Sequence, residues 1–211
     1  MSLLKTFAVL LSLLVSVSYA QEELETDFRF SGKHYSISYS LEANLQTIRM
    51  SGEILSTLVE DMSGFNRVLK LIRKDVPVKL VLFSGGGYLK SYERLPKTLK
   101  ENCNSEESNC RITTIVPGYA YCASACLNIF MVGDDRIAGK YSRFGFHQGA
   151  ALPGILKIPG FAQKSLRKSG VDAEWLKANK ELFFSLEMSW LYPNQLNGSN
   201  MVTGLSEAYE Y

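Results

Sequence analysis

One serine and one histidine stand out in this sequence because their surroundings suit acyl-transfer chemistry. Ser124 lies between two alanines, with a cysteine on each outer side, at the start of an apolar run. His147, one of only two histidines, follows 23 positions later at the end of a strand-like segment. Upstream, a glycine triplet follows Ser84 at the end of another apolar strand. A hydroxyl nucleophile, an imidazole base and accessible backbone amides are the parts of an acyl-transfer site.

Each of these features also has an ordinary structural explanation. A serine at the start of a helix is usually a cap, and a glycine run is usually a turn. A single histidine at a strand end is usually structural or solvated. The order and spacing of all three are more specific than any one of them, and they place the N–H groups of Gly87 and Ala125 where both would converge on one oxyanion.

Strand and helix patterns alternate through the middle of the chain. Apolar runs predict strands at residues 78–83, 112–116, 136–138 and 143–147, and helical spacing predicts helices at 56–74, 88–99 and 123–132. This alternation predicts an α/β fold with a parallel sheet and right-handed crossovers. Ligands of such sheets lie beyond the carboxyl ends of the strands, where the glycine triplet, Ser124 and His147 would meet.

Different patterns flank this unit. Alternating residues predict antiparallel strands at 27–30, 34–41 and 46–50. Prolines and glycines between 153 and 160 predict a loop over the site. Helices are predicted at 162–169 and 172–191, the second with Asp172 as its N-cap. We find no linker or repeat, so residues 21–211 are predicted to form a single domain.

The first 20 residues have the pattern of a secretory signal peptide. Lys5 precedes an apolar core at residues 7–17, and Ser18-Tyr19-Ala20 is a small-x-small cleavage site. We expect cleavage after Ala20 and a periplasmic or secreted mature protein. An uncleaved anchor is the alternative, but the apolar run is short for a bilayer span.

Composition excludes several classes of protein. With 211 residues, 46% hydrophobic and 21% charged, the chain is neither disordered nor a polytopic membrane protein. Without the signal segment it has one more basic than acidic residue. This charge gives no reason to expect nucleic acid or an anionic membrane as partner.

The four cysteines allow more than one arrangement. Cys103 and Cys110 enclose a polar loop and are candidates for a local disulfide. Cys122 and Cys126 are four residues apart, so they can pair with each other or with the loop cysteines. A zinc site from Cys122, Cys126 and His147 is conceivable, but no CxxC pair supports it. We therefore expect no metal and no cofactor.

Three short motifs together resemble a known family. They are Ser84-Gly85-Gly86-Gly87, Cys122-Ala123-Ser124-Ala125-Cys126 and Ser142-Arg143-Phe144-Gly145-Phe146-His147-Gln148. They resemble the proteolytic subunit of Clp protease, in the ClpP/crotonase superfamily, and especially its secreted or periplasmic, cysteine-flanked, uncharacterised bacterial relatives. The resemblance covers about residues 48–148. It implies a ClpP/crotonase-like ββα superhelix with a mainly parallel sheet and C-terminal helices.

The resemblance also implies a role for each matching residue. Ser124 corresponds to the nucleophile and His147 to the general base. Gly87 and Ala125 correspond to the oxyanion-hole amides, and Gly86 shapes the turn that presents them.

The chain departs from the family pattern at several positions. Gly85 replaces a proline, and Ala125 with Cys126 replaces a Met-Gly pair. The family's catalytic aspartate has no counterpart, because no acid lies between Glu187 and Glu207. Asn194 is the first choice for that place, since an amide can hold an imidazole in its working tautomer.

These observations favour a secreted serine hydrolase, most simply a peptidase acting on a peptide or protein substrate. The missing aspartate favours an alternative, a non-catalytic module that binds peptides or acyl ligands in the same pocket. A crotonase-type acyl-CoA enzyme ranks last, because a secreted protein has no ready supply of CoA. The resemblance further implies a homo-oligomer, a trimer or a ring, and outside the cytoplasm we expect no partner ATPase.

Overall fold

The computed structural model describes residues 26–54, 61–74, 76–87, 89–103, 110–148, 150–152, 156–157 and 160–207. The predicted signal segment, residues 1–20, lies outside the described residues. The strands are β1 Asp27–Ser31, β2 Tyr35–Glu42, β3 Leu45–Ile54, β4 Val78–Gly87, β5 Ile112–Val116, β6 Tyr121–Ala123, β7 Asp135–Gly139, β8 Arg143–Phe146, β9 Ala150–Leu152, β10 Leu156–Lys157, β11 Ser189–Leu191 and β12 Gly204–Ser206. The helices are α2 Ser63–Leu71, α3 Leu89–Asn102, α4 Ala125–Phe130, α5 Phe161–Lys168 and α6 Ala173–Ala178, with 3-10 turns η1 Lys180–Phe183 and η2 Pro193–Leu196.

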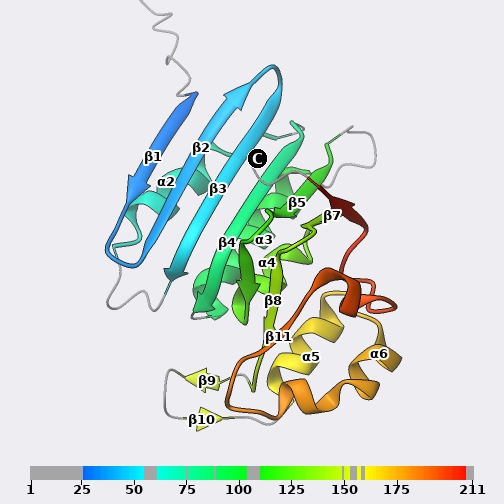
Figure 1. Cartoon of the computed structure of the whole chain (residues 1–211). Coiled ribbons are helices and arrows are strands. Elements are labelled where there is room, and N and C mark those ends of the chain that lie inside the picture. The colour runs from blue at the N-terminus through cyan, green and yellow to red at the C-terminus, as the bar shows by residue number, and fades with distance from the viewer. Residues whose placement is uncertain are drawn as a thin grey trace, which may run out of the picture.

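A mainly parallel sheet organises the molecule (Figure 1). Its strand order is β1-β2-β3-β4-β5-β7-β12, in which β1, β2 and β3 are antiparallel neighbours and the later pairs are parallel. A branch leaves this path at the end of β4, where Ser84 pairs with Cys122 of β6. The branch continues through β8 to β11. The predicted α/β class with a mainly parallel sheet is confirmed.

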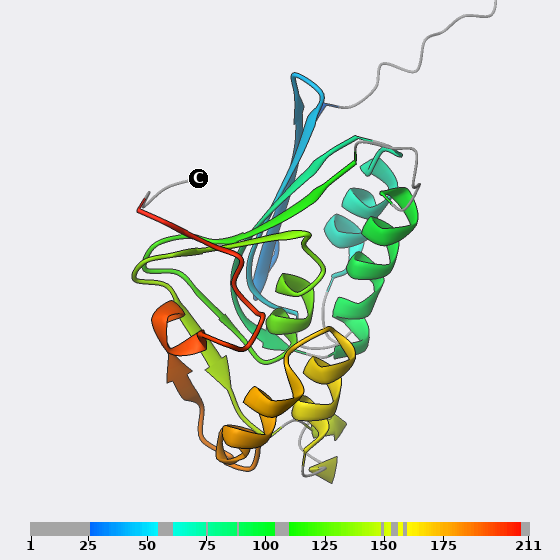
Figure 2. The same cartoon turned by 90° about the vertical axis from the view of Figure 1, so that its right-hand side faces the viewer.

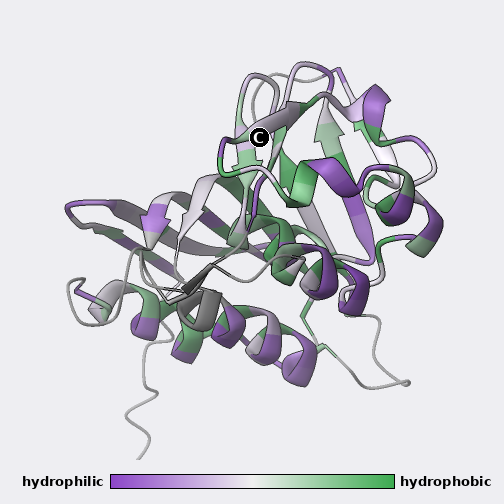
Figure 3. Ribbon diagram, turned by 90° about the horizontal axis from the view of Figure 1, so that it is seen from below, coloured by the Kyte–Doolittle hydropathy of each residue, from purple (hydrophilic) through white to green (hydrophobic). Residues whose placement is uncertain are grey.

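The core lies between the sheet and the helices on one of its faces. In β2, Tyr35, Ile37 and Tyr39 are buried, whereas the serines between them are half-buried. Phe65 and Val68 of α2 are fully buried, because they recur at helical spacing and turn toward the sheet. Figure 2 shows α2 and α3 side by side on this face, and Figure 3 shows hydrophilic residues on the outer sides of the helices.

One predicted helix is wrong over much of its length. The segment 172–191 begins as a helix, with the Asp172 carboxylate accepting the N–H of Trp175 as predicted, but α6 ends at Ala178. The side chain of Asn179 then donates to the Trp175 carbonyl at 2.9 Å, which occupies a helix-terminal acceptor. Further on, β11 pairs antiparallel with β8, placing Trp190 opposite Gly145.

Two other predicted boundaries shift. The helix predicted at 56–74 is described as a helix only from Ser63 to Leu71. The helix predicted at 123–132 begins at Ala125, because residues 121–123 form the short strand β6. The loop predicted at 153–160 lies mostly outside the described residues. Within the described part of the chain, no helix is long and apolar enough to cross a membrane.

Candidate active site

Ser124 occupies a sharp turn between β6 and α4. Its backbone has φ 55° and ψ −123°, a conformation that favours glycine. Its N–H donates to the Gly145 carbonyl at 3.0 Å, and its own carbonyl accepts the N–H of Leu127 at 3.1 Å. The turn leaves the serine half-buried, although the alanines on either side are buried. A strained strand-to-helix turn is the usual support for a nucleophilic serine.

His147 meets this serine from the neighbouring strand. The strands β6 and β8 are parallel, with Ala123 opposite Gly145, so the residues just beyond their carboxyl ends lie together. The His147 Nε2 atom is 2.7 Å from the Ser124 Oγ atom. This distance lies within the hydrogen-bond reach that a nucleophile and its general base require.

The surroundings of His147 favour the neutral form of its imidazole. Burial lowers the pKa of His147 below its ordinary value, because the charged form loses hydration. The Gln148 backbone acts in the opposite direction and raises the pKa, because a hydrogen bond to the charged ring favours imidazolium. Gln148 is itself fixed by its N–H, which donates to the Ser185 carbonyl at 2.7 Å. A neutral imidazole can accept the serine proton.

The glycine turn of β4 packs directly on Ser124. Gly86 has φ 100°, and a Cβ placed there would lie 2.8 Å from the Ser124 Cβ and 3.0 Å from the Ala125 amide nitrogen. Only glycine therefore fits at this position. The Gly86 N–H donates to the buried Ser84 hydroxyl at 3.1 Å, and this hydrogen bond suits the turn-shaping role expected of Gly86. Gly87 is the next residue, exposed, at the end of β4.

The four cysteines form two disulfides. Cys103 pairs with Cys110, and Cys122 pairs with Cys126 across Ser124. Because both cysteines of the second pair are bonded, the alternative zinc site with His147 is not formed. Among the described residues, no cluster of three His, Cys, Asp or Glu side chains could hold a metal ion. Two disulfides indicate an oxidising compartment.

Asn194 is the residue expected to take the place of the missing aspartate. It is an exposed residue of η2, and within the described part of the chain it makes no hydrogen bond to His147. No carboxylate among the described residues hydrogen-bonds the His147 ring either. The third member of the site therefore stays a prediction.

Sequence reasoning missed the side chains that cover the strands next to the site. A Cβ at Gly145 would lie 2.8 Å from both the Met188 sulfur and the Trp190 ring, so these side chains lie over that glycine. The Trp190 ring also contacts the Tyr121 ring edge-on, with 5.7 Å between their centroids. The Arg143 guanidinium carbon lies over the Trp190 ring, 5.3 Å from its centroid. These contacts depend on β11, which the sequence presents as part of a helix.

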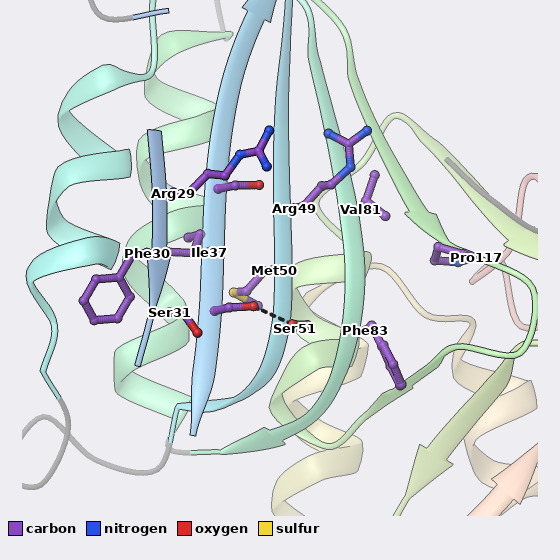
Figure 4. A pocket seen from close by; sticks show the side chains of 12 residues that line it. Arg29, Phe30, Ser31, Ile37, Arg49, Met50, Ser51, Val81, Phe83 and Pro117 are labelled. Carbon is purple, nitrogen blue, oxygen red and sulfur yellow. Dashed lines mark hydrogen bonds between the residues drawn. The ribbon is translucent and has the colours of Figure 1, made fainter. Parts of the chain in front are cut away.

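A separate groove of about 660 Å³ lies on the sheet face away from the helices (Figure 4). Arg29 and Arg49 point over it, and the hydroxyls of Ser36 and Ser51 hydrogen-bond each other at 2.7 Å along its floor. Phe83 marks its end nearest the glycine turn. Neither Ser124 nor His147 lines the groove.

The fold and the paired side chains thus define an α/β protein with a serine and a histidine at the carboxyl edge of a parallel sheet. No protein-family model matches the chain, and no curated protein matches it. Among solved structures, the chain is similar to a mutant ClpP1 from Listeria monocytogenes, at 19% identity and a TM-score of 0.45, over 76% of this chain and 91% of that chain.

Proposed function

We propose that the protein is a serine hydrolase that acts on peptide or protein substrates. The observation that carries the proposal is the 2.7 Å contact between the Ser124 hydroxyl and a neutral, half-buried His147. Three further features support it: the positive-φ turn at the serine, the glycine packed on that turn and the exposed Gly87 at the strand end. Together they suit a nucleophile, a base and an amide pocket.

The residues divide the reaction as follows. His147 accepts the proton of Ser124 while the serine oxygen attacks the substrate carbonyl carbon. The carbonyl oxygen becomes an oxyanion, which the N–H groups of Ala125 and Gly87 stabilise. His147 then gives the proton to the leaving amine, and an acyl-serine remains. Water, deprotonated by the same imidazole, hydrolyses this ester and frees Ser124.

The imidazole needs a partner on its second nitrogen. The Gln148 carbonyl suits this place, and Asn194 remains the side-chain candidate. A carbonyl or an amide can hold the tautomer that presents Nε2 to the serine, but neither neutralises an imidazolium as a carboxylate does. We therefore infer a slower hydrolase than one with a complete triad.

The surroundings of the reaction follow from the disulfides and from the predicted signal segment. An oxidising compartment fits a periplasmic or secreted protein whose mature chain begins at Gln21. The single domain, the homo-oligomer and the likeness to secreted relatives stay predictions. Sedimentation of the purified mature chain distinguishes a monomer from a trimer or ring.

A non-catalytic binding module is the second candidate. It is favoured by the absence of a carboxylate hydrogen-bonded to His147 among the described residues. In that case the pocket beside Ser124 would hold a peptide or acyl ligand without turnover.

Labelling with a fluorophosphonate separates the two candidates. We expect the mature protein to be labelled and to hydrolyse ester and peptide substrates, and expect Ser124→Ala and His147→Gln to do neither. Ser189→Ala is the matched control, because Ser189 is a half-buried serine of β11 opposite Phe146. A wild-type protein that neither labels nor hydrolyses would refute the hydrolase and leave the binding module.

A further inference from the structure

The serine of the proposed site lies at the middle of a small covalent ring. The disulfide between Cys122 and Cys126 spans a sequence separation of four, with Ser124 at its centre. Cys122 belongs to β6 and Cys126 to α4, so the bond joins the strand to the helix across the turn between them. Their Cα atoms are 5.4 Å apart.

The turn needs such support because its backbone conformation is unfavourable. Ser124 has a side chain at φ 55°, and a residue in this region persists only when its surroundings hold it there. Two backbone hydrogen bonds help to hold this turn: the Ser124 N–H donates to the Gly145 carbonyl, and the Leu127 N–H donates to the Ser124 carbonyl. No side-chain cap starts α4, since the Ser124 hydroxyl contacts His147. The disulfide thus adds a covalent tie between the strand and the helix start to these two hydrogen bonds.

Cys122, the cysteine of this disulfide that lies in the strand, is held in the sheet by neighbours on both sides. Cys122 pairs with Ser84 on one side and with Phe144 on the other, and its side chain is fully buried. Cys126 is fully buried as well. The bond therefore transmits the position of the sheet to the first turn of α4, and with it to Ser124 and the neighbouring amide.

We propose that the Cys122–Cys126 disulfide is a positioning device that makes the reactivity of Ser124 depend on redox state. The inference rests on the proposed function and adds its regulation. Because both cysteines are fully buried, a dithiol reductant reaches the bond only when this part of the fold opens locally; it then converts the disulfide to two thiols and leaves as its own cyclic disulfide. The ring around Ser124 then opens, the positive-φ turn relaxes, and the serine oxygen leaves the reach of the His147 nitrogen. A small-molecule disulfide such as oxidised glutathione would reoxidise the two thiols, itself being reduced to thiols, and restore the contact.

The second disulfide provides a matched control within the same chain. Cys103 follows α3 and Cys110 precedes β5, so their bond lies near the amino ends of β4 and β5. Ser124 lies near the carboxyl end of β4, which is ten residues long and spans roughly 30 Å at the usual rise per residue. Loss of the remote disulfide should affect stability but not the site.

The test compares two double variants, Cys122→Ala with Cys126→Ala, and Cys103→Ala with Cys110→Ala. We expect the first to lose fluorophosphonate labelling by roughly tenfold or more, as a misplaced nucleophile does, and the second to label within about twofold of wild type. Titration of the two histidines by NMR gives a readout independent of activity. His34→Gln identifies the His147 signal, whose pKa should change only in the first variant.

If the first double variant does not fold, the Cys103→Ala, Cys110→Ala variant treated with dithiothreitol replaces it, because only the disulfide at the site then remains to be reduced. Loss of labelling that returns on reoxidation supports the proposal. Unchanged labelling and an unchanged His147 titration after confirmed reduction overturn it, while the hydrolase stands. If oxidised wild type does not label, the proposed function fails, and the His147 titration alone decides whether the disulfide positions the pair.

Discussion

Replacing Ser124 by glycine should leave the fold more stable than replacing it by alanine. Both substitutions remove the hydroxyl and its 2.7 Å contact with His147, so their difference reports on the Cβ atom alone. At φ 55° and ψ −123° a residue with a Cβ is strained, whereas glycine is not.

The size of this difference follows from two opposing contributions. A non-glycine residue in a sparsely populated backbone region costs about 1–3 kcal/mol. Glycine gains more conformational freedom in the unfolded chain, which costs about 0.4–1 kcal/mol relative to alanine. We therefore expect Ser124→Gly to exceed Ser124→Ala by about 1 kcal/mol in free energy of unfolding, or about 2–4 °C in Tm for a chain of this size.

Urea and thermal unfolding of the oxidised variants measure this difference. Ala125→Gly is the matched control, because Ala125 is the first residue of α4 and glycine weakens a helix by up to about 1 kcal/mol. Glycine in place of alanine should therefore raise the free energy of unfolding at position 124 and lower it at position 125. A Ser124→Gly protein less stable than Ser124→Ala would refute the strained turn.

Three further outcomes are expected. Because burial lowers the pKa of His147, labelling should rise with pH through a value below about 6.5 and be level at neutral pH. The same shift makes folding stability depend on pH. The contribution of His147 to stability is complete above about 6.5 and falls as pH drops toward the lowered pKa, because the unfolded chain binds the proton more readily. The labelling rate, from reactions quenched at fixed times at each pH, tests the first effect. The urea midpoint at each pH tests the second. Gly86→Ala should cut labelling by roughly 100-fold, since its Cβ would lie 2.8 Å from the Ser124 Cβ, whereas Gly170→Ala, at φ 96° with no atom within 4 Å of the added Cβ, should cost stability alone. Ser142→Ala should raise the free energy of unfolding by up to about 1 kcal/mol, because its buried hydroxyl has no partner in the described residues; a marked loss in a urea titration would count against this.

The sequence predicts the sheet and the meeting of Ser124 with His147 well. Apolar runs locate β4, β5 and β8, and parallel strands bring their carboxyl ends together whatever the details of the loops. The 2.7 Å contact follows from that topology, because β6 and β8 are neighbours.

What the sequence does not reveal depends on contacts distant along the chain. The short strand β6 resembles the start of a helix, because its three residues precede an apolar helical run. Residues 189–191 form a strand only because the edge of β8 accepts them, with Gly145 leaving room for Trp190. The pairing of Cys122 with Cys126 depends on the turn at Ser124. The interaction of the Gln148 backbone with His147 cannot be recognised from sequence, since every residue has the same backbone groups.

If His147 activates Ser124 as a nucleophile, Ser124 should react covalently in the folded protein. Peptide mapping by mass spectrometry after fluorophosphonate treatment at neutral pH measures this reaction at the residue itself. We expect one adduct, on the peptide that contains Ser124. It should be absent when the protein is denatured before labelling and absent in His147→Gln. An unmodified Ser124 in the folded, oxidised protein, or equal modification with and without His147, would contradict the activation of Ser124 by His147.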